Sequence, residues 1–256
     1  MWYIEFLRVR KALSIYGLML LVLFAVTVAF RVYGTFHRYG ADHFTSQPIE
    51  GLAAVGAFIT AFFATALATS LAYHVGGHLE IAWTKPVSRD RFVFEVLLVD
   101  AIAIALAYLA TIVSIITTIM VFSGRFPVVF SQLGIARTAL EFVFVFAFYM
   151  VIQAVTSGQR RYAGMIAGIA WPVFLFIMAA PTMHMPPAVS KFFEVIDFMN
   201  PLALISVSND PGMNDSGMIK NMLQLPLWSA PAVLDACALI VVAFIIALVR
   251  WRRIEA

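Results

Sequence analysis

The sequence predicts an all-α membrane protein, a single domain over residues 1–256 with six transmembrane helices. Hydrophobic residues make up 62% of the chain and charged residues only 12%, and the mean hydropathy is +0.93. Soluble proteins carry about 25% charged residues. The apolar residues gather in runs of about 20, the length that spans the ~30 Å hydrocarbon core of a bilayer. No polar stretch is long enough to form a separate soluble domain.

The first expected element is an interfacial helix over residues 1–11, whose aromatic residues are interleaved with charged ones, including Arg8. Such a helix lies at the membrane surface with its basic residues toward the headgroups, so we expect an elbow that leads into the first span. Pro172 lies near the middle of the fifth span and should kink that helix. The six spans are predicted at about residues 12–32, 51–73, 92–122, 138–156, 162–180 and 231–249.

The orientation follows from the basic residues in alternate connections. Eleven lie on the side that holds both termini, and six lie on the other side over longer connections. The positive-inside rule places the richer side in the cytosol. We therefore expect a multi-pass protein of the cytoplasmic (inner) membrane with both termini cytosolic. The eleven residues are Arg8, Arg10, Lys11, Lys85, Arg89, Arg91, Arg160, Arg161, Arg250, Arg252 and Arg253.

The cytosolic loop over residues 74–91 is the most polar short segment between two spans. Pro86 disfavours helix at Lys85, so a helix that begins near Gly77 should end there. Ser88 is suited to cap the next helix, which would then begin at Arg89. These residues alone leave two interpretations open. The loop is either an ordinary basic loop that obeys the positive-inside rule or a rigid element that docks onto a partner.

Two motifs in this loop resemble a known family. The stretch Gly77-His78-Leu79-Glu80 is followed by Lys85-Pro86-Val87-Ser88-Arg89, as in the type-2 permeases of ATP-binding-cassette (ABC) transporters. Those permeases also share the layout of an N-terminal elbow, six spans and a last outward connection with Asn-Pro-Leu, here Asn200-Pro201-Leu202. The resemblance implies that residues 77–89 form a coupling helix in a groove of a separate ATPase subunit. It also implies short outer-leaflet helices before the last span.

The function implied by this resemblance is that of a permease subunit, which moves substrate out across the membrane while a partner hydrolyses ATP. The chain has no G-x-x-x-x-G-K-[ST] motif, so ATP and Mg are expected on the ATPase subunit and no cofactor or catalytic residue in this chain. The other expected partners are a second copy or a homologous permease and membrane lipid, and no nucleic acid. Two alternatives stay open, namely an intramembrane enzyme acting on lipid or peptide and a non-transporting scaffold or sensor.

Ionisable residues inside the spans are functional candidates, because a charge at membrane depth is costly. Asp100 should lie about 13 Å deeper than Arg91 on one helix, so it needs a partner or a hydrated cavity. Whether it makes a structural hydrogen bond or lines a translocation path is left open. Glu141 is expected to pair with Arg137 one turn earlier.

No metal site is expected. His74 and His78 would share a helix face near Glu80, but the H-E-x-x-H motif is absent and Gly76 and Gly77 weaken the helix that such a pair needs. The single cysteine, Cys237, lies in an apolar run, which excludes a disulfide framework or a thiol metal cluster.

Small residues at helical spacing predict close helix packing. Gly164 and Gly168 form a Gly-x-x-x-Gly pattern in the fifth span, which lets two backbones approach. Spacing does not decide whether such faces meet within one chain or across a dimer. The second span carries two such stripes, Ala53, Ala57, Ala61, Thr65 and Thr69, and Gly56, Thr60, Ala64 and Ala68.

Overall fold

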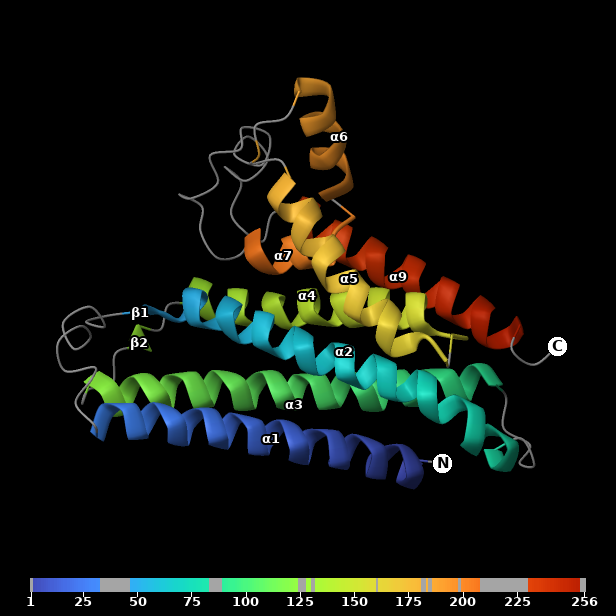
Figure 1. Cartoon of the computed structure of the whole chain (residues 1–256), viewed down its shortest axis with the longest axis horizontal. Coiled ribbons are helices and arrows are strands. Elements are labelled where there is room, and N and C mark those ends of the chain that lie inside the picture. Colours follow the sequence, from blue (N-terminus) through green and yellow to red (C-terminus); the bar gives the residue numbers. More distant parts are fainter. Residues whose placement is uncertain are drawn as a thin grey trace.

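The chain forms a bundle of long helices in the computed structural model (Figure 1). The structure describes residues 2–32, 47–82, 89–123, 128–129, 132–159, 161–180, 183, 186–197, 199–207 and 230–253. A two-residue parallel pair of strands, β1 (Gln47–Pro48) and β2 (Val128–Val129), joins the connections before the second and fourth helices. The helices are α1 (Trp2–Val32), α2 (Ile49–Ala82), α3 (Arg89–Ser123), α4 (Gln132–Thr156), α5 (Ala163–Ala179), α6 (Pro187–Asp197), α7 (Pro201–Val207) and α9 (Ala230–Arg253).

Helix α4 is the centre of the bundle. It packs most extensively on α2 and α9, and it also contacts α3, α5 and α7. On the other side α1 lies alongside α3, which also packs on α2 (Figure 1). Both termini lie at one end of the bundle, and α6 projects away from it (Figure 1). The core is therefore formed by α2, α3 and α4, whereas α1 and α9 are largely exposed.

Five helices are long and apolar enough to cross a membrane, one fewer than the sequence predicted. The helix at the fifth predicted span, α5, has 17 residues and therefore reaches only about 26 Å, short of the ~30 Å core. It runs through Pro172 as one helix. The five candidate spans are Glu5–Ala29, Gly51–Tyr73, Val93–Val121, Thr138–Thr156 and Val233–Arg250.

The predicted N-terminal elbow is not a separate helix. α1 runs without a break from Trp2 to Val32, and its candidate span already begins at Glu5. No proline interrupts this stretch, so nothing in the local sequence ends the helix before the span. The side chain of Arg8, expected at the headgroups, is 5% exposed and points into the bundle instead.

The boundaries around the predicted coupling loop agree with the sequence on one side only. α3 begins at Arg89, directly after Ser88, as the predicted cap requires. α2, however, continues through Gly77–Glu80 to Ala82, so this stretch extends the second helix and does not begin a new one. Lys85, Pro86 and Ser88 lie outside the described residues.

The small residues of α2 allow its neighbours to approach closely. Both predicted stripes are mostly buried, and Ala57, Ala61, Ala64 and Ala68 are fully buried. A Cβ atom on Gly56 would lie 3.2 Å from a side-chain carbon of Ile112 on α3. The stripes therefore serve packing within this chain, against α3 and α4.

Candidate functional site

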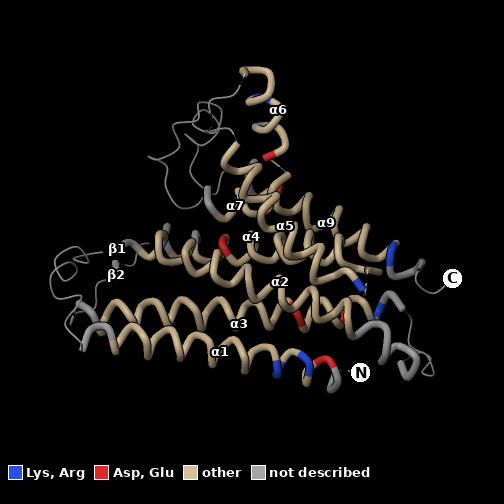
Figure 2. Tube along the Cα trace, viewed as in Figure 1, with Lys and Arg blue, Asp and Glu red and all other residues tan. Residues whose placement is uncertain are grey.

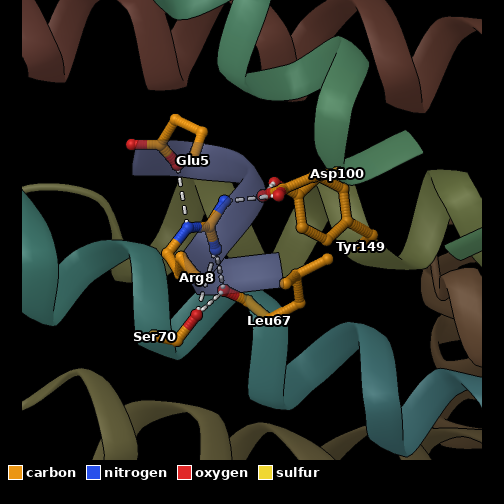
Figure 3. A network of polar contacts seen from close by, with 6 residues as sticks. All are labelled: Glu5, Arg8, Leu67, Ser70, Asp100 and Tyr149. Atoms are coloured by element: carbon orange, nitrogen blue, oxygen red, sulfur yellow. Dashed lines mark hydrogen bonds and ion pairs between the residues drawn. The ribbon is translucent and has the colours of Figure 1, made fainter. Parts of the chain in front are cut away.

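A buried polar cluster joins four helices near the end of the bundle where the termini lie (Figure 3). Its centre is Asp100 on α3, whose side chain is fully buried. One carboxylate oxygen of Asp100 accepts a hydrogen bond from an Nη of Arg8 on α1, and the other accepts one from the hydroxyl of Tyr149 on α4 at 2.5 Å. We call Arg8, Asp100 and Tyr149 the Arg8 node.

The guanidinium of Arg8 also reaches α2. Its other Nη donates to the carbonyl oxygen of Leu67 at 3.3 Å and to the hydroxyl of Ser70 at 3.0 Å. Its Nε donates to Glu5, one turn earlier on α1, at 2.9 Å. One planar side chain therefore bonds α1, α2 and α3 together, a role for which the fixed fork of arginine donors is suited.

The geometry of the node is that of a tether between helices. Both oxygens of Asp100 carry a donor, and Tyr149 is also fully buried. A buried charge is tolerated where it is paired and hydrogen-bonded, and both conditions hold here. The carboxylate is thus enclosed by protein on α1, α3 and α4 and presents no exposed oxygen to lipid or to a substrate.

A second polar contact fixes α1 further along its length. The hydroxyls of Tyr16 and Thr111 lie 2.6 Å apart, and Thr60 on α2 lies 3.5 Å from Thr111. The rest of α1 is mainly apolar and exposed, with Leu18 62% accessible. The attachment of α1 to the bundle therefore depends on Arg8, Tyr16 and its contact with α3.

Glu141, the other predicted intramembrane acid, is buried on α4 but is remote from the node. It lies eight residues before Tyr149, about 12 Å along the helix. The hydroxyl of Tyr108 on α3 lies in this region and donates to the carbonyl oxygen of Thr138 at 3.1 Å. The structure therefore does not bring Asp100 and Glu141 together. The side chain of Arg137, the expected partner of Glu141, lies outside the described residues.

Gln153 is a polar residue of α4 that follows Tyr149 by one helical turn. Its side chain is 1% exposed, and neither its amide nitrogen nor its amide oxygen has a hydrogen-bond partner among the described residues. A buried amide without a partner costs free energy.

The two glycines of the Gly-x-x-x-Gly pattern have different surroundings. The backbone N–H of Gly164 donates to the hydroxyl of Tyr73 on α2 at 3.2 Å, and a Cβ atom there would lie 2.9 Å from that oxygen. Around Gly168 nothing lies within 4 Å of the corresponding position. Of these two glycines, only Gly164 is at a close contact within the described chain. Trp171 gives α5 a further link to α2 through a 3.0 Å hydrogen bond to Thr65.

The predicted coupling residues fall at the end of the bundle that holds both termini, because α2 ends and α3 begins there (Figure 1). The Lys and Arg residues coloured in Figure 2 also lie at this end, apart from the one in α6. Of the coupling residues themselves, Gly77, His78, Leu79 and Glu80 lie in α2, and Arg89 is the first residue of α3. Among the described residues, no group of three or more metal-binding side chains is found.

Sequence reasoning identified Asp100 but not its partners. Arg8 was assigned to the headgroups because its neighbours form an amphipathic pattern, and Tyr149 is one aromatic residue among many. The available signal was the buried acid itself, since a carboxylate at that depth requires a cation or donors on facing helices. No protein-family model, curated protein or solved structure matches the chain.

Proposed function

We propose that the chain is the membrane permease subunit of an ABC transporter, in which a separate ATPase subunit binds ATP and Mg and drives export of a substrate. The permease would work as a dimer with a second copy or a homologous permease. The observation that carries the proposal is the segment 77–89. It has the sequence Gly-x-Leu-Glu followed by Lys-Pro-Val-Ser-Arg, and it connects two of the longest helices at the basic end of the bundle.

The position of the termini supports a sixth crossing by α5. Both termini lie at one end of the bundle (Figure 1), and an odd number of crossings would place them at opposite ends. With the five long helices, α5 completes an even number. A 17-residue helix spans a bilayer when the membrane thins locally or when flanking residues extend the apolar stretch, each at modest cost. Both termini and the loop then face the cytosol in this proposal.

The two short helices before α9 also support the proposal. α6 and α7 are short helices between α5 and α9, and Asn200 precedes α7. The Asn200 side chain donates to the carbonyl oxygen of Phe174 on α5 and accepts from the backbone N–H of Leu202. In this proposal the Asn-Pro-Leu sequence fixes the turn between α6 and α7, and these two short helices lie in the outer leaflet.

Cross-linking tests the docking site. A cysteine at Ala82 in a chain with Cys237→Ser should link to a protein that carries the G-x-x-x-x-G-K-[ST] motif when the complex is isolated from its native membrane. Ile135 is the matched control, because it is 60% exposed and lies near the start of α4, at the opposite end of the bundle. A cysteine there should link to no ATPase. Purification of an intact chain without an ATPase, or equal linking from both positions, would contradict the proposal.

The enclosed geometry of the node gives the intramembrane enzyme no support. A general acid or base needs to reach a reacting group within hydrogen-bond distance. Asp100 is fully buried and both of its oxygens accept hydrogen bonds from Arg8 and Tyr149, so it does not meet this requirement in this conformation.

A further inference from the structure

We propose that Arg8 is a positioning residue that makes α1 follow the movement of the segment between α2 and α3. This inference rests on the proposed function, because it assumes that an ATPase moves that segment. The side chain of Arg8 is hydrogen-bonded to both helices that hold the segment, to Leu67 and Ser70 on α2 and to Asp100 on α3. A displacement of α2 and α3 would therefore be transmitted to α1 through the guanidinium.

The residues that Arg8 contacts on α2 and α3 lie at similar distances from the segment that joins these two helices. Ser70 is 12 residues before the end of α2 at Ala82, and Asp100 is 11 residues after the start of α3 at Arg89. These separations correspond to about 18 Å and about 17 Å along the helices. Arg8 thus contacts α2 and α3 at nearly the same distance from the segment on which the ATPase would act.

Apart from its packing on α3, α1 has few contacts with the bundle, so the hydrogen bonds of Arg8 form an important part of its attachment. Only 11% of the residues in its apolar window are buried, against 56% in each of α2, α3 and α4. α1 packs mainly on α3 and very little on α2. Without Arg8, the described polar connection between α1 and the core is the Tyr16 contact, which lies eight residues further from the loop. Arg8 is therefore the tether closest to the loop.

Tyr149 extends the connection to α4. It donates to the second oxygen of Asp100 from α4, the helix that packs most widely in the bundle. Asp100 therefore accepts one hydrogen bond from α1 and one from α4, so its carboxylate links α3 to both helices. The arrangement connects a peripheral helix to the core through one fully buried carboxylate.

Helix α3 offers a matched control. Arg91 pairs with Glu95 at 2.9 Å, also through an arginine Nε, but the Arg91 side chain is 72% exposed and both residues belong to α3. Loss of this pair removes an arginine and an ion pair but breaks no contact between two helices. Because Arg91 ends the predicted docking loop, Arg91→Gln is compared only in complexes that still contain the ATPase, and there it should leave the movement of α1 unchanged.

The experiment measures the distance between α1 and α9 in the complex of the permease with its ATPase in nanodiscs. Spin labels are placed at Leu18 and Val241, which are 62% and 55% exposed, in a chain with Cys237→Ser. The distance is compared without nucleotide and with ATP plus vanadate. We expect a shift in the wild-type complex, loss of at least half of that shift in Arg8→Gln and Asp100→Asn, and the full shift in Arg91→Gln.

The outcomes separate this inference from the proposed function. If the wild-type chain captures no ATPase, the proposed function fails and this inference with it. If it captures one but the labels do not move, or move equally in Arg8→Gln, the inference alone is overturned. Should Arg8→Gln fail to assemble, Arg8→Lys keeps the charge with fewer donors. It should bind the ATPase normally and lose at least half of the shift, and a full shift would overturn the inference.

Discussion

Replacing Arg8 by methionine should destabilise the protein strongly, because the change leaves Asp100 buried without its cation. Methionine supplies an unbranched apolar side chain that is shorter than that of arginine, and it makes none of the four hydrogen bonds that Arg8 donates. Removal of one member of a buried ion pair costs about 3 to 5 kcal/mol. The side chains of Arg8 and Asp100 are 5% and 0% exposed, which places the pair in this class.

The double variant Arg8→Met/Asp100→Leu should recover much of this loss. Replacing both charges with apolar residues removes the desolvation penalty together with the attraction, so the net cost of losing a buried pair is often small. Tyr149 then lacks an acceptor, which should leave a residual loss of about 1 to 3 kcal/mol. The exposed pair provides the reference, since Arg91→Met should cost no more than about 1 kcal/mol.

Equilibrium unfolding in mixed micelles with increasing SDS measures these free energies, and circular dichroism reports the loss of helix. A buried ion pair should give a coupling free energy of at least about 2 kcal/mol between the two substitutions in the double-mutant cycle. If Arg8→Met costs no more than Arg91→Met, or if the double variant is as unstable as the sum of the single ones, Arg8 and Asp100 are not a buried pair.

Three further changes test other parts of the structure. Gln153→Met should raise the free energy of unfolding by about 1 kcal/mol in the same assay, because it replaces an amide without described partners, and a loss would show that the amide is bonded. Gly164→Leu should lower the melting temperature by several degrees because its side chain would meet the hydroxyl of Tyr73, whereas Gly168→Leu should leave it unchanged. A similar loss at both glycines would contradict these different surroundings. Burial raises the pKa of Asp197 above its ordinary value, although a hydrogen bond from Asn200 partly opposes this. The folded chain therefore binds the proton more tightly than the unfolded chain, and the carboxyl lowers stability as the pH rises through these pKa values. Asp197→Asn should stabilise the protein at pH 7 and lose this advantage toward pH 4, and a gain that does not depend on pH would refute the assignment.

Much of the helical layout could be predicted because hydropathy is a local property. The second and fourth spans were expected at residues 51–73 and 138–156, and the candidate spans Gly51–Tyr73 and Thr138–Thr156 have these bounds. α5 differs because its flanking residues do not continue the helix far enough, so an apolar run of the right length yields a helix of only 17 residues.

The polar node was predicted only in part because its members are distant in the sequence. The depth of Asp100 in its helix showed that it needed a partner, and this required only the helical rise. The identity of that partner depends on which face of α1 meets α3, and 92 residues separate Arg8 from Asp100. The local amphipathic pattern favoured the headgroups for Arg8, and a tertiary ion pair overrode it.

The same separation has a consequence for the synthesis of the protein. Arg8 leaves the ribosome 92 residues before Asp100, and at 5 to 20 residues per second this delay is about 5 to 18 s. During that time only Glu5, one turn earlier on α1, can pair with the guanidinium of Arg8, and burying the guanidinium in the hydrocarbon core without Asp100 is costly. We therefore expect the beginning of α1 to stay at the membrane surface until α3 has been inserted and Asp100 is available. Arg8 would then move inward, so that the first helix to be made is the last of the three to reach its final depth.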